Sequence, residues 1–183
     1  MNKNIPNCLT MLRVLMIPAF VVVLMRGHAF AAAILFALAS ATDALDGHLA
    51  RKYDLISNFG KLMDPLADKL LVVSAFACFV ELGVVPAWVL IVILAREFTI
   101  TGLRAVAASE GVVIAAGASG KLKTVFQMLA VLALLLRDIP GIVLGAAFVP
   151  WGARVAVGLL AVAVLLTIYS GAEYVVKSRQ LFR

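Results

Sequence analysis

The stretch TDALDGHLARKYDLISNFGKLMDPLADK, residues 42–69, contains five aspartates in a chain that is otherwise mostly apolar. The whole chain has only 10 acidic residues, so half of them lie in this stretch. Asp43 and Asp46 are three residues apart, and Asp64 and Asp68 are four apart, the spacings at which helical side chains share a face. The remaining one, Asp54, falls between the two pairs and is interpreted as a solvated loop residue.

The composition around this stretch indicates an all-α integral membrane protein. The 183 residues are 64% hydrophobic and only 14% charged, with a mean hydropathy of +1.08, and a water-soluble domain needs a larger charged share. A bilayer-spanning helix takes about 20 apolar residues. We therefore predict one membrane domain over residues 1–183 with six transmembrane helices, at 10–25, 29–51, 60–81, 85–107, 122–136 and 151–176.

The net charge of +6 is spread between apolar segments and forms no basic stripe. Anchoring beside anionic lipid headgroups explains it better than nucleic-acid binding, so no nucleic-acid partner is expected. If the amino terminus is cytoplasmic, the opposite face holds only Arg26, Arg137 and Arg154. The cytoplasmic side then holds Lys3, Arg51, Lys52, Lys61, Lys121, Lys123, Lys177, Arg179 and Arg183. This asymmetry predicts that both termini and the aspartates are cytoplasmic.

Two antiparallel helices joined near residues 52–59 would aim four carboxylates into one cleft. Without a cation among them, the charges would repel each other, and each would suffer a desolvation cost of several kcal/mol. Ligand sets made only of oxygen favour Mg²⁺, Mn²⁺ or Ca²⁺ over zinc. Four carboxylates suit two such ions about 4 Å apart, a pair that typically clamps a phosphate or pyrophosphate.

Small and basic residues between the aspartates fit a phosphate ligand. Gly47 and Gly60 have no side chain, so a bulky ligand can approach the backbone, and Ala50 keeps the same helix face low. Arg51 can neutralise a phosphate oxygen. Helix packing is an alternative explanation for Gly47 and Ala50, and paired acidic residues often form only a solvated face. Carboxylates at membrane depth are costly, which favours a functional role for the four aspartates.

Together these residues resemble the signature of the CDP-alcohol phosphotransferases, D-x2-D-G-x2-A-R-x8-G-x3-D-x3-D, with every spacing intact. The resemblance implies six transmembrane helices, a homodimer, a cytoplasmic cavity, and transfer of a substituted phosphate from a CDP-linked donor to an alcohol with release of CMP. It implies two divalent cations, Mg²⁺ or Mn²⁺, and Asp68 as general base. The implied metal ligands are Asp43, Asp46, Asp64 and Asp68. The implied CDP contacts are Asp43, Asp46, Gly47, Ala50, Arg51 and Gly60.

Stretches outside the signature extend the resemblance to nearly the whole chain. NIPNCLTMLRVLMIP, DPLADKLL and AREFTITGLRAVAASEGVVIAAGASGKLKT are similar to bacterial members that use CDP-diacylglycerol as donor and sn-glycerol 3-phosphate as acceptor. This implies phosphatidylglycerophosphate and CMP as products, membrane lipids as surroundings, and the bacterial cytoplasmic (inner) membrane as location. Asn7, Thr10 and Arg13 resemble a family element near the cavity.

Four cations support an anionic acceptor independently of the resemblance. Arg96 and Arg104 lie in the fourth predicted span, and Lys121 and Lys123 enter the fifth, so all four are expected on the cytoplasmic side near the aspartates. A glycerol phosphate needs such a clamp, for which arginine is the usual residue. Glu97 is expected to orient Arg96. Positive-inside anchoring explains the two lysines almost as well.

Other functions stay open at the level of the sequence. A member of the same family with inositol phosphate, serine or phosphatidylglycerol as acceptor would keep the signature and differ around residues 96–123. A divalent-cation transporter could also use intramembrane aspartates. Against a transporter, the aspartates cluster towards one face, no inverted repeat is visible, and the small residues of the signature would go unexplained. A non-catalytic membrane scaffold would not need four convergent carboxylates.

Overall fold

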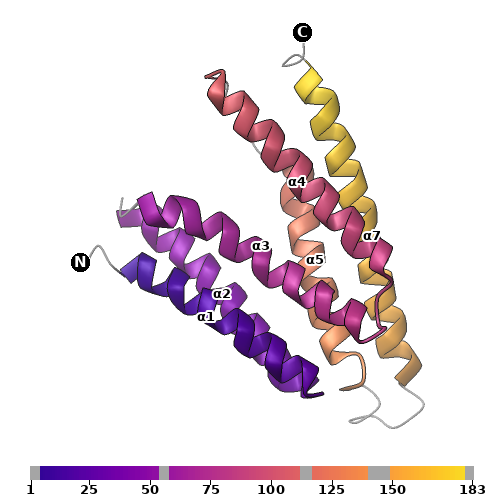
Figure 1. Cartoon of the computed structure of the whole chain (residues 1–183). Helices are drawn as coiled ribbons and strands as arrows, with labels where there is room; N and C mark the ends of the chain where they lie inside the picture. Colours follow the sequence, from indigo (N-terminus) through magenta and orange to yellow (C-terminus); the bar gives the residue numbers. More distant parts are fainter. Residues whose placement is uncertain (1–4, 54–57, 112–116, 140–148, 180–183) are drawn as a thin grey trace. The chain divides into compact units, whose positions relative to one another are not determined.

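The structure, a computed structural model, describes residues 5–53, 58–111, 117–139 and 149–179, and within these ranges the side chains outside 5–10, 43–53, 58–62, 64–65, 68 and 149. The described part of the chain contains helices and no strand, which confirms the all-α prediction (Figure 1). The helices are α1 (Ile5–Met25), α2 (Ala29–Tyr53), α3 (Asn58–Glu81), α4 (Ala87–Ser109), α5 (Ala118–Leu136) and α7 (Val149–Lys177).

The chain divides into two compact units, Met1–Leu82 and Gly83–Arg183, and each is described by itself. The first unit holds α1, α2 and α3, and the second holds α4, α5 and α7. That residues 1–183 form one membrane domain stays a prediction.

In the first unit, α1 and α2 form an antiparallel pair. Residues 26–28 connect them, and Gly27 takes a φ of +84°, a left-handed conformation that favours glycine and lets the chain reverse within a few residues. Phe20 of α1 and Phe36 of α2 meet across the pair with ring centroids 5.9 Å apart, and both are buried. Helix α3 packs against α1 and α2 to complete this unit.

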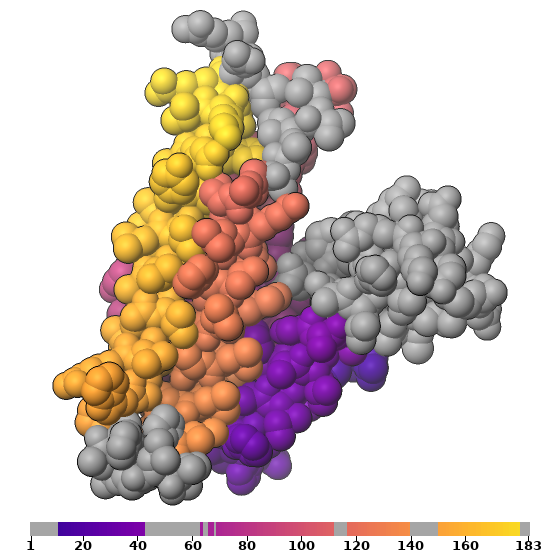
Figure 2. All heavy atoms as spheres, turned by 180° about the vertical axis from the view of Figure 1, so that it is seen from behind, coloured from indigo at the N-terminus to yellow at the C-terminus, as the bar shows by residue number. Residues whose placement is uncertain are grey.

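In the second unit, α5 and α7 lie side by side in antiparallel orientation (Figures 1 and 2). Ser119 near the start of α5 bonds Glu173 near the end of α7, and Gln127 further along α5 bonds Thr167 further back along α7. Helix α4 packs against α7 in parallel orientation. Arg96 of α4 bonds Ser170, and Arg104, further along α4, bonds Tyr174, further along α7. Gly111, with a φ of +73°, follows the end of α4 and allows the chain to leave the helix.

Two described helices are long and apolar enough to cross a membrane, Ala118–Leu136 and Pro150–Lys177. Shorter apolar helical stretches, Met11–Met25 and Ala29–Thr42, lie in the first unit. Leu165 and Ile168 of α7 are exposed, whereas Ala163 and Thr167 on the other face are buried, a pattern that suits a helix with lipid on one side. The count of six membrane spans stays a prediction.

Candidate functional site

Arg96 and Arg104 lie on the face of α4 that meets α7. Ile93 and Ile100 are buried on this helix; Arg96 follows Ile93 by three residues, and Arg104 follows Ile100 by four. Such offsets return to nearly the same direction on a helix. Arg96 is largely buried there, whereas Arg104 is exposed and reaches α7 through its bond to Tyr174.

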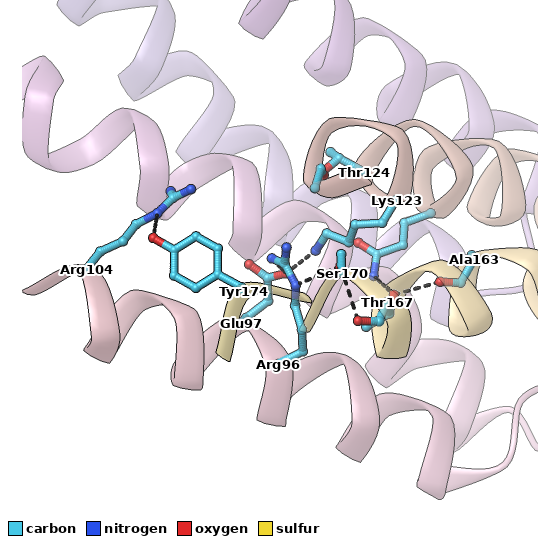
Figure 3. Close-up of polar contacts among 11 residues, drawn as sticks. Arg96, Glu97, Arg104, Lys123, Thr124, Ala163, Thr167, Ser170 and Tyr174 are labelled. Carbon is cyan, nitrogen blue, oxygen red and sulfur yellow. Dashed lines mark hydrogen bonds and ion pairs between the residues drawn. The ribbon is translucent and has the colours of Figure 1, made fainter. Parts of the chain in front are cut away.

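A compact ionic cluster forms around Arg96 (Figure 3). Arg96 donates from Nη1 to Oε1 of Glu97 over 3.1 Å, and Lys123 of α5 donates from Nζ to the same oxygen. All three side chains are largely or fully buried, Lys123 most of all with a residue exposure of 4%. Two cations thus share one carboxylate oxygen in a poorly hydrated place, where electrostatic interactions are strong.

A chain of hydrogen bonds continues from Arg96 into α7. Arg96 donates from Nε to Oγ of Ser170 over 3.3 Å, and Ser170 donates to the carbonyl oxygen of Thr167 over 3.2 Å. Thr167 donates to the carbonyl oxygen of Ala163 over 2.6 Å and accepts from Nε2 of Gln127 over 3.1 Å. These bonds join α4, α5 and α7 through polar groups inside an otherwise apolar unit.

Arg104 is held by one tyrosine. Its Nε donates to Oη of Tyr174 over 3.0 Å, and its Cζ lies 5.4 Å from the centroid of the same ring. Tyr174 is buried, so it offers a fixed support. Among the described residues the two Nη groups of Arg104 have no hydrogen-bond partner, and they remain as donors for a ligand.

Both guanidinium groups reach α7, and they do so at neighbouring turns. Arg96 and Arg104 are eight residues apart on α4, whereas their partners Ser170 and Tyr174 are four apart on α7. The long ring of Tyr174 extends from α7 towards Arg104 and spans the difference (Figure 3). Guanidinium groups with unused N–H donors can hold a phosphate-bearing ligand.

The two lysines predicted to bind the acceptor differ in their surroundings in the structure. Lys123 is buried and joins Arg96 through Glu97, while Lys121 is exposed and makes no side-chain hydrogen bond or ion pair with the described residues. Glu97 accepts a hydrogen bond from Arg96, as expected of a residue that orients this arginine. That these four cations bind glycerol phosphate stays a prediction.

The signature aspartates lie on the helices expected for them. Asp43 and Asp46 fall within α2, and Asp64 and Asp68 within α3, so both pairs keep their helical spacing. Their side chains lie outside the described residues, as do those of Asn7, Thr10, Gly47, Ala50, Arg51 and Gly60. The described side chains include no group of three potential metal ligands. As a donor set, four carboxylates on two neighbouring helices fit hard divalent cations.

Arg13 lies at the level of the aspartates within the first unit. It precedes Phe20 by seven residues, and Asp43 follows Phe36 by seven, so in the antiparallel pair α1 and α2 both positions lie about two turns beyond the aromatic contact in the same direction. Arg13 is 1% exposed. A guanidinium buried to this degree is stable only with polar or anionic partners.

Sequence reasoning missed the polar face of α7, which was predicted only as an apolar span. Thr167, Ser170 and Tyr174 stand at positions i, i+3 and i+7, the spacing of one helix face. Three polar groups on one face of an apolar helix are a signal that could have shown an internal partner.

Comparison with known proteins relates the chain to one family. Residues 3–169 match the family model described as CDP-alcohol phosphatidyltransferase. The chain is 42% identical to the CDP-diacylglycerol–glycerol-3-phosphate 3-phosphatidyltransferase of Bacillus subtilis (strain 168), over 96% of this chain and 95% of that protein. It is 39% identical to a probable phosphatidylglycerophosphate synthase of Mycobacterium tuberculosis, over 96% and 81% of the two chains. A Shigella flexneri protein with the same name as the Bacillus enzyme is 37% identical over 98% and 97%.

Proposed function

The chain belongs to the CDP-alcohol phosphatidyltransferase family, and on that basis we propose that it transfers the phosphatidyl group of CDP-diacylglycerol to sn-glycerol 3-phosphate. The products are phosphatidylglycerophosphate and CMP, and the chain is a transferase of phospholipid biosynthesis. One observation carries this proposal: relatives similar over 96% of the chain or more bear names for this reaction.

The described cations support an acceptor that carries a phosphate. Arg96 and Lys123 share one carboxylate in the interior of the second unit, and Arg104, two turns further along α4, offers two Nη groups. An acceptor without an anionic group, such as diacylglycerol, would gain little from these charges, whereas a phosphate dianion accepts several charge-assisted hydrogen bonds. We therefore assign the phosphate of glycerol phosphate to these three residues, with Lys121 as a more distant, solvated cation.

The four signature aspartates of α2 and α3 form the proposed catalytic centre. Asp43, Asp46, Asp64 and Asp68 would hold two divalent cations, Mg²⁺ or Mn²⁺. When bound, such ions neutralise the pyrophosphate and stabilise the charge that builds on the leaving CMP. Asp68 takes the proton of the acceptor hydroxyl as this oxygen attacks the lipid-linked phosphorus.

The remaining signature residues bind the nucleotide part of the donor. Gly47, Ala50 and Gly60 leave space along the helix backbone for CDP, and Arg51 pairs with a phosphate oxygen. Arg13, at the level of Asp43 in the α1–α2 pair, lines the same cavity together with Asn7 and Thr10. Its buried positive charge is complementary to the carboxylates and phosphates expected there.

The membrane arrangement follows from the two substrates. The lipid donor enters sideways from the bilayer and the acceptor arrives from the cytoplasm, so a site at the cytoplasmic interface serves both. We propose six spans in a single membrane domain, with both termini and the site on the cytoplasmic side of the bacterial inner membrane, and a homodimer as the assembled state. The apolar outer face of α7 and the length of α5 are consistent with this arrangement.

The test is CMP release by the purified protein in detergent, with CDP-diacylglycerol and Mg²⁺ or Mn²⁺. sn-Glycerol 3-phosphate, inositol phosphate, serine and phosphatidylglycerol are compared as acceptors. We expect CMP release with sn-glycerol 3-phosphate alone, and its loss in Asp68→Asn. Asp54→Asn is the matched control, because Asp54 occupies a variable position of the signature, and it should keep the activity.

The outcomes separate the parts of the proposal. Release with a different acceptor would keep the family reaction and refute the substrate. Release that persists in Asp68→Asn would refute the role of this residue as general base. Absence of CMP release with every acceptor would overturn the enzymatic function and call for cation-flux measurements.

A further inference from the structure

We propose that one face of α7, made of Ser170, Gly171 and Tyr174, positions the two arginines of α4 for the phosphate of the acceptor. These three residues are positioning residues, since they act through Arg96 and Arg104. The inference rests on the proposed function and adds the part of the fold that sets acceptor affinity. Sequence motifs point to α2 and α3 for chemistry, whereas this face lies on the last described helix.

Tyr174 fixes the direction of Arg104. A free arginine has many rotamers, and a ligand that binds it must order them. Here the Nε–Oη bond of 3.0 Å and the ring beneath the guanidinium hold the group from two sides, so both Nη groups are presented in one orientation. Tyr174 is buried in the unit and has little freedom of its own.

Gly171 makes the path of Arg96 possible. A Cβ added at Gly171 would lie 3.2 Å from Cγ of Arg96, a tighter contact than most Cβ atoms make. Across the side chain, a Cβ added at Gly120 of α5 would lie 3.3 Å from Nη2 of the same arginine. Arg96 therefore runs through a slot between two glycines, and an alanine on the α7 side would displace it.

Ser170 completes this support. Its hydroxyl donates to the carbonyl oxygen of Thr167, so its oxygen lone pairs are left to accept from Nε of Arg96. With Nε on Ser170 and Nη1 on Glu97, the described partners of Arg96 leave Nη2 for a ligand. Ser170 and Gly171 thus aim one N–H pair of Arg96, just as Tyr174 aims those of Arg104.

The inference predicts an effect on the acceptor, sn-glycerol 3-phosphate, and none on the lipid donor. If α7 orients the arginines, weakening this support lowers the affinity for sn-glycerol 3-phosphate and leaves the affinity for CDP-diacylglycerol unchanged. A purely structural role would lower stability or affect both substrates alike. The ratio between the two effects therefore distinguishes positioning from general packing.

The first test is Tyr174→Phe, which removes only the oxygen that Arg104 bonds and keeps the ring. We expect the KM for sn-glycerol 3-phosphate to rise roughly 3- to 10-fold, because the lost hydrogen bond orients Arg104 and is not itself a contact with the ligand. The KM for CDP-diacylglycerol and the thermal midpoint should stay unchanged. Tyr169→Phe is the matched control, because Tyr169 is exposed on the same helix, and the described side-chain partners of the two arginines on α7 are Ser170 and Tyr174.

A second test uses Gly171→Ala, with Gly158→Ala as its control. Both are changes from glycine to alanine within α7, but a Cβ at Gly158 would meet no atom within 4 Å. Alanine favours the helix at either position, so the gain in helix propensity is common to both variants and cannot by itself produce a difference between them. A rise in the KM for sn-glycerol 3-phosphate confined to Gly171→Ala would support the inference.

A double-mutant cycle completes the design. In an Arg104→Ala background, Tyr174→Phe should have no further effect on the acceptor KM, because its only route to the ligand has been removed. The inference is overturned if Tyr174→Phe behaves like Tyr169→Phe in an active enzyme, or if it raises both KM values equally. A wild-type protein that releases no CMP with glycerol phosphate would instead refute the proposed function.

Discussion

Lys123 of α5 donates a hydrogen bond from its buried ammonium to the carboxylate of Glu97 on α4, and so links these two consecutive helices of the second unit. The same carboxylate oxygen accepts from Arg96. A single acidic residue thus sets the spacing of two cations. Such an arrangement keeps like charges close enough to act on one ligand while limiting their repulsion.

Replacing Glu97 by glutamine should lower the free energy of unfolding by about 1–3 kcal/mol, because the buried ammonium of Lys123 loses this counter-charge. Thermal unfolding in detergent measures the change. Glu110→Gln is the control, since Glu110 is exposed just beyond the end of α4. Equal midpoints for the two variants would show that the Glu97 ion pair does not support the unit.

The two neighbouring lysines should differ sharply in function. Lys123→Met removes a buried cation of the ionic cluster and should lower kcat/KM for sn-glycerol 3-phosphate roughly 10-fold or more. Lys121→Met removes an exposed charge and should change it less than about 2-fold. Initial rates of CMP release at varied acceptor concentration measure both. A larger loss from Lys121→Met would contradict the assignment.

Packing in the first unit should depend on the aromatic contact between α1 and α2. Phe36→Ala leaves a cavity against Phe20 and should destabilise the protein by about 2–4 kcal/mol. Phe30→Ala, on the same helix but with a largely exposed ring, should cost less than about 1 kcal/mol. Thermal midpoints in one detergent compare the pair. If Phe30→Ala were the more damaging, this core would be wrongly assigned.

Removal of divalent cations should abolish the reaction. EDTA in excess should reduce CMP release on the order of 100-fold or more, and added Mg²⁺ or Mn²⁺ should restore it. A parallel sample that receives EDTA already saturated with Mg²⁺ controls for effects of the chelator itself. Undiminished turnover after EDTA would contradict the assignment of the four aspartates as metal ligands.

The helices of this protein could be placed from hydropathy, with starts that differ by up to five residues, as at α1, predicted from residue 10 and observed from Ile5. The predicted span 29–51 corresponds to Ala29–Tyr53, and 122–136 corresponds to Ala118–Leu136. Helix α5 begins four residues before the predicted span because Ser119 and Lys121 are polar. An apolar window excludes them, although they belong to the helix. Hydropathy reports burial in lipid, whereas a helix begins where backbone hydrogen bonding begins.

The candidate site was predictable in part. Arg96, Arg104 and Lys123 could be named because charges within apolar spans are costly and therefore conspicuous. Their supports could not be named in the same way. Serine and glycine are common in membrane helices because they allow close packing. Ser170 and Gly171 therefore carry no signal in the sequence, and only the structure shows that both contact Arg96 of α4.

The tight turn at Gly27 also bears on how the protein is made. The Phe20–Phe36 contact joins residues that are close in sequence, so it can form as soon as α2 has left the ribosome. Only a short connection has to close for this contact, so the entropic cost of pairing α1 with α2 is low. Asp43 and Asp46 lie on α2 at the end far from the turn, so the pairing of the two helices also fixes the position of their backbone against α1.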